Sequence, residues 1–386
     1  MKILNAGAPP AVYSNMPPSK TTKKHAKTAP DAWFTSQLME WHATHNRREM
    51  PWKGEKDPYR IWLSEIILQQ TRVEQGWAYY LRFTEAYPTV QQLAAAPDES
   101  VFKLWEGLGY YSRCRNLLAA ARQIVAQHGG IFPADYQQII NLKGVGPYTA
   151  AAIASFAFGL PHAVVDGNVI RVLARFFGID TAFDSTEGKK QFARKAQQLL
   201  HLPAPGAYNQ AMMDFGATVC TPQKPQCGQC PLATHCEARL HSLTSSLPVK
   251  GKKLLRRDRL LLYTVVKSEA GLLVRRRQQR DVWQDLYELV LIEPEDGQVP
   301  PLAEWQATLR AQLAMPGLVL TSLHGPLKQE LTHQTIRAML AHGLVAKQPA
   351  PAGYEWADEE RLRQLAFPRL LARYLQQTNG AQASIF

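Results

Sequence analysis

The fold is decided by the stretch Leu142-Lys143-Gly144-Val145-Gly146-Pro147-Tyr148-Thr149-Ala150, which leads into an alanine-rich apolar segment. Gly144 and Gly146 favour a tight, left-handed turn that a β-carbon would obstruct, and Pro147 suits the first position of a helix. The pattern predicts a helix–hairpin–helix over residues 139–158, whose exposed backbone N–H groups would suit a phosphate. On these residues alone, an αα-hairpin whose glycines merely permit close packing explains the pattern equally well.

Asp166 follows this hairpin in the run Val164-Val165-Asp166-Gly167-Asn168 and opens a helix that we predict over Asn168–Phe177. Aspartate is a good helix N-cap, and capping alone would account for it. Its position at a corner beside a phosphate-binding turn suggests more, because a helix N-terminus favours the ionised carboxylate. Such an anion suits a positive charge that develops on a substrate.

A second carboxylate, Glu65, lies in the predicted helix Pro58–Gln75, where Ile61, Glu65 and Leu68 share one face. Apolar surroundings raise the pKa of a carboxyl group and make it a candidate proton donor. An exposed glutamate on a polar helix face is the usual alternative. If Glu65 meets Asp166 in space, their pKa values would be pushed apart, as expected of the acid and the anion in glycosidic cleavage.

The length and the net charge of the chain limit its possible functions. The chain has 386 residues, enough for two or three domains, and Lys plus Arg exceed Asp plus Glu by 44 to 32. The resulting net charge of +12 points to a polyanion, either nucleic acid or an anionic membrane surface. No apolar run approaches the roughly 20 residues of a membrane span. We therefore expect a protein of the reducing cytoplasm that acts on DNA or RNA.

Shifts in composition divide the chain into four parts. Residues 1–30 carry five Lys, five Pro and no acid, and they are predicted to be a disordered basic arm. Residues 31–240 form a helical unit, residues 241–258 a basic linker, and residues 259–386 a second, α+β domain. Helices of the first unit are predicted over Asp31–Thr44, Pro58–Gln75, Trp77–Ala86, Asp98–Leu104, Arg115–His128 and Asp135–Asn141. The second domain has strand-like runs at Leu260–Val266, Gly271–Arg275, Leu286–Ile292 and Leu318–Leu323, and helix-like segments at Pro301–Leu313 and Asp358–Leu365.

Two tyrosines occur in the glycine-rich run Gly107-Leu108-Gly109-Tyr110-Tyr111-Ser112-Arg113. Beside Arg113 and Arg115, Tyr110 and Tyr111 are able to wedge into a base stack. The alternative is that they are core aromatics at the start of a helix.

Four of the five cysteines have the spacing C-x6-C-x2-C-x5-C: Cys220, Cys227, Cys230 and Cys236. In a cytoplasmic protein this clustering indicates a metal site rather than disulfides. The spacing leaves zinc and an iron–sulfur cluster both open. Cys114 is expected to be a small buried apolar residue.

Together, these motifs resemble the MutY-type adenine DNA glycosylases of the helix–hairpin–helix superfamily. The resemblance spans residues 31–240 through Trp62-Leu63-Ser64-Glu65, Leu68-Gln69-Gln70-Thr71, Gly107–Tyr111, Gly144-Val145-Gly146, Asp166-Gly167-Asn168, Asn209-Gln210-Ala211 and the four cysteines. It implies a mainly α helix–hairpin–helix glycosylase core with a 4Fe–4S cluster, followed by an α+β Nudix-like domain for lesion recognition. The implied partner is double-stranded DNA with adenine opposite 8-oxoguanine or guanine, bound by a monomer at the nucleoid of a bacterial-type cytoplasm.

The resemblance also implies roles for individual residues. Glu65 would protonate adenine N7, and Asp166, oriented by Asn168, would stabilise the oxocarbenium ion. Tyr148 would support this intermediate. Substrate contacts are implied for Trp52 and Gln210 on adenine, for Gln70, Thr71 and Tyr110 beside the opposing guanine, for Leu108, Thr332 and His333, and for Lys143, Gly144, Val145 and Gly146 on the DNA backbone.

The chain departs from the family pattern in places. Lys143 replaces the usual proline of the hairpin, Lys53 stands where an arginine is common, and the family's Phe-Ser-His sensing loop appears as Leu331-Thr332-His333. Tyr148 occupies the position of the Schiff-base lysine in bifunctional relatives, which implies a glycosylase without lyase chemistry. An endonuclease III-like glycosylase/lyase and a non-catalytic iron–sulfur DNA-binding protein are the alternatives.

Overall fold

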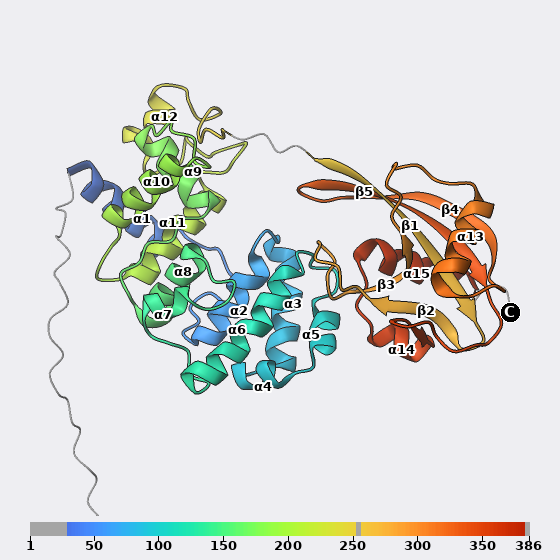
Figure 1. The fold of residues 1–386 in the computed structure, drawn as a ribbon. Coiled ribbons are helices and arrows are strands. Elements are labelled where there is room, and N and C mark those ends of the chain that lie inside the picture. Colours follow the sequence, from blue (N-terminus) through green and yellow to red (C-terminus); the bar gives the residue numbers. More distant parts are fainter. Residues whose placement is uncertain (1–28, 252–255, 383–386) are drawn as a thin grey trace, which may run out of the picture.

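The computed structural model describes residues 29–251 and 256–382, which form a helical unit and a unit built on a β-sheet (Figure 1). The predicted basic arm, residues 1–30, lies outside the described residues except for Ala29 and Pro30, which belong to the first helix. Within the predicted linker 241–258, residues 252–255 also lie outside them, and strand β1 begins at Arg257. No helix in the described ranges is both long and apolar enough to cross a membrane.

The described part of the first unit consists of helices joined by loops. Its helices are α1 (Ala29–Thr44), α2 (Pro58–Leu68), α3 (Val73–Ala86), α4 (Val90–Ala95), α5 (Asp98–Trp105), α6 (Ser112–His128), α7 (Tyr136–Ile140), α8 (Pro147–Phe158), α9 (Gly167–Phe177), α10 (Thr186–Leu199), α11 (Pro205–Thr218) and α12 (Glu237–Leu240). The short helix α4 was not predicted from the sequence. It begins with a reciprocal capping box between Thr89 and Gln92.

The alanine-rich helix α8 lies between two hydrophobic cores. Its residues Ala150, Ile153 and Ala154 pack into the core around α2–α6, while Ala151 and Ala152 pack into the core around α1 and α9–α11. Small side chains on opposite sides allow neighbouring helices to approach closely on both. The segment that decided the fold in the sequence is thus the central helix of the unit.

The prediction of one helix over Pro58–Gln75 is wrong, because α2 ends at Leu68 and α3 begins at Val73. Gln70 between them has a left-handed backbone, with φ +56°. The guanidinium of Arg113 binds the carbonyl oxygens of Ile66 and Ile67, which are among the unpaired acceptors at the end of α2. This contact comes from a distant part of the chain, so periodicity could not show it.

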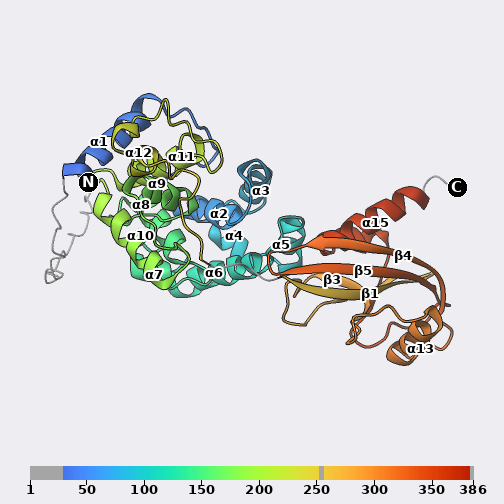
Figure 2. The same cartoon turned by 90° about the horizontal axis from the view of Figure 1, so that it is seen from above.

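The second unit is a six-stranded sheet in the order β4-β5-β1-β3-β2-β6, in which β1 and β5 run parallel and the other neighbours antiparallel. Helix α13 covers one face and α15 the other (Figure 2). The strands are β1 (Arg257–Ser268), β2 (Gly271–Arg276), β3 (Tyr287–Ile292), β4 (Val319–Glu330), β5 (Gln334–Leu344) and β6 (Glu355–Ala357), and the helices are α13 (Leu302–Leu313), α14 (Glu359–Gln364) and α15 (Arg369–Gln382). β5, β6 and α15 were not predicted, and β4 is longer than the predicted Leu318–Leu323.

The sheet unit packs against α5 of the helical unit. The guanidinium of Arg361 on α14 forms two hydrogen bonds of 2.7 and 2.9 Å with the carboxylate of Glu99 on α5. The backbone N–H of Phe367 donates to the carboxylate of Glu106 at the end of α5, at 2.8 Å. These contacts between the two units fix the position of the β4–β5 hairpin relative to the glycine-rich turn after α5.

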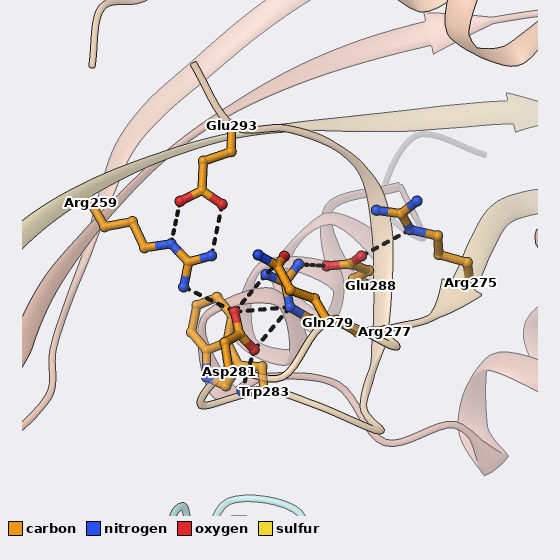
Figure 3. Close-up of polar contacts among 8 residues, drawn as sticks. All are labelled: Arg259, Arg275, Arg277, Gln279, Asp281, Trp283, Glu288 and Glu293. Carbon is orange, nitrogen blue, oxygen red and sulfur yellow. Dashed lines mark hydrogen bonds and ion pairs between the residues drawn. The ribbon is translucent and has the colours of Figure 1, made fainter. Parts of the chain in front are cut away.

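A buried network of arginines and carboxylates organises the loop between β2 and β3 (Figure 3). Arg277 pairs with Glu288 at 2.6 Å and with Asp281, and Arg259 pairs with Asp281 at 2.9 Å. Arg275 also pairs with Glu288. Arginines therefore neutralise the carboxylates of this network.

Candidate active site and DNA interface

A cavity of about 420 Å³ opens in the helical unit where α2, α8, α9 and α11 meet. Its wall includes Glu65 from α2, Tyr148 from the first turn of α8, and Asp166 at the start of α9. The structure thus brings together the two carboxylates that the sequence singled out separately. Five more of the named residues line the same wall: Trp52, Lys53, Thr71, Asn168 and Gln210.

Glu65 is the buried carboxyl group of the cavity, with 6% of its surface exposed. Burial raises the pKa of Glu65 to about 7. The Tyr148 hydroxyl opposes this rise by donating a hydrogen bond to the carboxylate, and the nearby charge of Asp166 adds to it. The predicted upward shift is confirmed. Near neutral pH, Glu65 therefore exists in both its protonated and its ionised form.

Asp166 caps helix α9, as its residue type predicted. Its carboxylate accepts hydrogen bonds from the backbone N–H of Val169 at 2.7 Å and from the side-chain amide of Asn168 at 2.8 Å. Burial nevertheless raises the pKa of Asp166, even though these hydrogen bonds lower it. The expectation that the helix N-terminus would dominate is therefore wrong, and the two carboxyl groups both shift upward.

Arg171, which was not singled out from the sequence, links the start of α9 at Asn168 to the cysteine loop. Its guanidinium donates to the Asn168 side-chain oxygen and to the backbone oxygens of Gly216 and Cys220, each at 2.7 Å. An arginine three residues after Asn168 on a helix can reach it, which was the available signal. The contact with Cys220 joins segments that are distant in the sequence, so no local pattern indicated it.

Gln210 on α11 presents an unpaired donor to the cavity. Its side-chain nitrogen is buried and has no hydrogen-bond partner among the described residues. A buried donor without a partner is costly, so this group suits an acceptor on a bound ligand. Trp52 lies in the cavity wall and packs edge-on against Tyr80, with ring centroids 5.4 Å apart.

Asp214, also on α11, holds the loop that carries Trp52. It is fully buried and accepts hydrogen bonds from Arg48 at 2.9 Å and from Asn46 at 2.8 Å. Lys53 lies 3.5 Å from the same carboxylate. Two cations and an amide thus converge on a single buried anion, which fixes the loop over the cavity. Nothing near Asp214 in the sequence pointed to these partners.

The turn before α8 has the form expected of a phosphate site, with one correction. Gly144 has φ +75°, and a β-carbon there would lie 2.5 Å from the Asn116 side chain. Gly146 is extended, with φ −95°, so only one of the two glycines is left-handed. The N–H groups of Lys143 and Val145 are bound to Gln123 and Leu142. Those of Gly144 and Gly146 have no hydrogen-bond partner among the described residues.

Five predicted residues lie on a second surface, formed by the loop after α2, the glycine-rich turn and the turn between β4 and β5. Tyr110 is 42% exposed and has a left-handed backbone, with φ +47°. Its hydroxyl is hydrogen-bonded to the hydroxyl of Thr332, in the turn between β4 and β5. Gln70 is exposed, and the Thr71 hydroxyl accepts a hydrogen bond from Arg113. His333 is exposed beside Thr332.

Two side chains of the glycine-rich turn belong to the core instead. Leu108 is buried in the core, and its implied substrate contact stays a prediction. Tyr111 is also buried and stacks on Phe102, with ring centroids 6.4 Å apart. Of the two tyrosines, only Tyr110 is available to wedge into a base stack.

The four clustered cysteines lie on the loop between α11 and α12, and none of them forms a disulfide within the described residues. Burial raises the pKa of Cys230 to about 12, and the three neighbouring thiols add to the rise. A cationic centre would reverse this cost, because metal ligation requires thiolates. Arg175 supports such a centre by donating to the Cys220 sulfur at 3.5 Å. Cys114 is buried, as predicted.

Family models match most parts of this architecture. Residues 63–201 match the HhH-GPD superfamily of base excision DNA repair proteins, and residues 262–377 match the NUDIX domain. Residues 220–236 match the iron–sulfur binding domain of endonuclease III. This match decides between the two metals that the spacing left open, since four thiolates suit a 4Fe–4S cluster.

Relatives and solved structures agree. The chain is 32% identical to the adenine DNA glycosylase of Buchnera aphidicola (strain APS) over 66% of its own length and 73% of that protein's. It is 45% identical to the human adenine DNA glycosylase over 53% of this chain and 39% of that one. A thermostable thymine-DNA glycosylase superposes with a TM-score of 0.51 at 30% identity, over 55% of this chain and 97% of that chain. The protein therefore belongs to the adenine DNA glycosylase family.

Proposed function

We propose that the protein excises adenine that lies opposite 8-oxoguanine or guanine in double-stranded DNA, by hydrolysing the N-glycosidic bond. One observation carries the proposal: Glu65, with a pKa of about 7, shares a cavity with Asp166. Cleavage of a glycosidic bond needs a proton for the leaving group and a negative charge for the sugar cation. These two carboxyl groups supply both.

The first task of the site is to bind and protonate the base that leaves. An adenine rotated out of the duplex enters the cavity beside Trp52, where the free donor of Gln210 meets an acceptor on the base. Protonated Glu65 gives its proton to N7, so that the protonated base takes the electron pair of the breaking C1′–N9 bond and leaves as neutral adenine. The Tyr148 hydroxyl then stabilises the carboxylate that Glu65 has become.

The second task of the site is to stabilise the sugar cation that forms when the base leaves. Asp166 in its ionised form faces the oxocarbenium ion, and the amide of Asn168 keeps its carboxylate in place. Tyr148 occupies the first turn of α8, where a lysine would be needed to form a Schiff base with the sugar. Water therefore completes the reaction, and the DNA strand is left uncut.

The opposing base is read on the other surface. Thr332 and Tyr110, hydrogen-bonded to each other from two domains, form the part of this surface best placed for the base opposite adenine. A hydroxyl is able to accept a hydrogen bond from N7–H, which 8-oxoguanine has and guanine lacks. The extruded adenine cannot carry this information, so the preference has to come from outside the cavity.

Product analysis tests the proposal. Duplexes with adenine opposite 8-oxoguanine, guanine or thymine are incubated with excess protein, and free bases and strand breaks are measured separately. We expect free adenine from the first two duplexes, fastest opposite 8-oxoguanine, and no break until alkali or heat is applied. Release of a pyrimidine, or strand breaks without alkali, would favour an endonuclease III-like lyase. Binding without any release would favour a non-catalytic DNA-binding protein.

The cluster gives a separate expectation. Purified protein should be yellow-brown, with a broad absorbance in the violet that bleaches when the cluster is lost. Elemental analysis should find iron and sulfide in equal amounts and no stoichiometric zinc. Zinc without iron would contradict the cluster assignment. Bleaching should weaken DNA binding, since the cysteine loop carries the exposed Lys224 toward a polyanion.

Thr332→Val tests the reading of the opposing base. The variant keeps the shape of the side chain but cannot accept a hydrogen bond, so the preference for 8-oxoguanine over guanine should fall by roughly fivefold, or about 1 kcal/mol. Excision opposite guanine should change little. Thr321→Val, the same change at an exposed position in strand β4, is the control. An unchanged preference would remove Thr332 from lesion recognition.

A further inference from the structure

Arg113, in the first turn of α6, is a buried cation without an acidic partner. It is 7% exposed, and its guanidinium donates only to neutral oxygens. Burial lowers the pKa of Arg113 to about 10, so the group is still charged at neutral pH. Its Nε–H is buried without any partner among the described residues. Such an arrangement is costly, which points to a role beyond packing.

The five acceptors of Arg113 come from two segments that are distant in the sequence. Nη1 donates to the backbone oxygens of Ile66 and Ile67, at 2.9 and 2.8 Å, in the last turn of α2. Nη2 donates to the Thr71 hydroxyl at 3.3 Å and to the backbone oxygens of Leu108 and Gly109, at 3.4 and 3.2 Å. One guanidinium therefore ties the end of α2 and the loop after it to the glycine-rich turn.

Both segments hold an exposed side chain in a strained backbone conformation. Gln70 has φ +56° and Tyr110 has φ +47°, in the left-handed region that non-glycine residues seldom adopt. Gly107 and Gly109 beside Tyr110 are left-handed as well. Such conformations persist where the surroundings enforce them, and they cluster at functional sites. The Arg113 guanidinium also lies 5.6 Å from the centre of the Tyr110 ring, close enough for a cation–π contact.

We propose that Arg113 is a positioning residue for extrusion of the adenine, which rests on the proposed function of adenine removal. It holds Tyr110 and Gln70 at the duplex face in the conformations from which they fill the space that the base leaves. The acid and the anion line the cavity, whose wall does not include Arg113, and they act only after the base has entered it. Arg113 thus acts on the flipping step and leaves bond cleavage unchanged.

The substitutions separate charge from geometry. Arg113→Lys keeps the cation but replaces a planar fork of donors by a single ammonium group that cannot span both segments. Arg113→Gln removes the charge. Arg122→Lys is the matched control, because Arg122 lies on the same helix and also binds backbone oxygens, those of Ala94 and Ala96 at the end of α4. Melting temperature reports the purely structural cost of each change.

Flipping is measured without cleavage. The probe is a duplex with 2-aminopurine in place of adenine, on a 2′-fluoro sugar that resists formation of the oxocarbenium ion, opposite guanine. We expect Arg113→Lys to reduce the fluorescence increase on binding by at least about fivefold, the effect of losing a few hydrogen bonds, while Arg122→Lys gives the wild-type increase. Adenine release under single-turnover conditions should fall by the same factor, with an unchanged pH profile. A normal fluorescence increase in a folded Arg113→Lys protein would overturn the proposal.

A double-mutant cycle tests the route. If Arg113 acts through Tyr110, its substitution should matter little when Tyr110 is already replaced by alanine. In the Tyr110→Ala background, Arg113→Lys should therefore reduce the fluorescence increase by no more than about twofold. An undiminished cost on that background, or a shifted pH profile with normal flipping, would place Arg113 in another role and overturn the proposal. If wild-type protein flips the probe but releases no adenine, the proposed function fails and the role of Arg113 in flipping stands. If it does not flip the probe, the inference fails.

Discussion

Glu65→Gln is expected to release adenine at least about 10²-fold more slowly than the wild type, the usual scale for losing a general acid. The amide keeps the size of the side chain and its hydrogen bond with Tyr148, but it has no proton of comparable acidity to give. Binding to the mispaired duplex should remain within a few-fold of wild type, because the carboxyl group faces the cavity and not the DNA backbone.

Single-turnover release and duplex affinity, measured together, check this result. Glu85→Gln, an exposed change on α3, serves as the control for the loss of one carboxylate. Stability should increase or stay the same in Glu65→Gln, since the buried carboxyl group is replaced by a neutral one. Near-normal release would remove Glu65 from the mechanism, whereas loss of duplex binding would assign it to recognition.

Asp166→Asn is expected to slow adenine release by about 10²- to 10³-fold, the cost of losing one group that stabilises transition-state charge. Asparagine is as good an N-cap as aspartate, so the hydrogen bond from the N–H of Val169 and the start of α9 should survive. What disappears is the negative charge that faces the sugar cation.

The matched control for this change is Asp135→Asn, which removes the charge of another N-cap, at the start of α7. That variant should release adenine at the wild-type rate. Asp166→Asn should melt within a few degrees of wild type and still bind the duplex. If Asp166→Asn were as active as Asp135→Asn, the capping role would be sufficient and the electrostatic role would be wrong.

Local patterns in the sequence predicted much of this site. Gly144, Pro147 and Asp166 each mark a helix boundary through their own conformational preference, and the hairpin and α9 begin where these residues place them. The raised pKa of Glu65 followed from its apolar neighbours on one helix face. These inferences succeeded because the interactions behind them are local in the chain.

Contacts between segments that are distant in the chain could not be predicted from the sequence. The end of α2 depends on Arg113, and the loop over the cavity depends on Asp214, which lies on α11. The direction of the Asp166 pKa shift was missed for a similar reason, since burial is a property of the whole fold. Strand β5 was missed because polar residues such as Arg337 and His342 interrupt its apolar pattern.

The central claim is that a carboxyl group with a pKa of about 7 gives its proton to the adenine that leaves. The pH dependence of single-turnover adenine release, opposite 8-oxoguanine, tests it most directly. Wild-type rate constants should be highest where Glu65 is protonated and should fall as the pH rises through about 7, approaching tenfold per pH unit, as general acid catalysis requires. The small residual rate of Glu65→Gln should lack this fall. A wild-type rate that stays constant from about pH 6 to 9, or a Glu65→Gln variant that shows the same descending limb, would contradict the account.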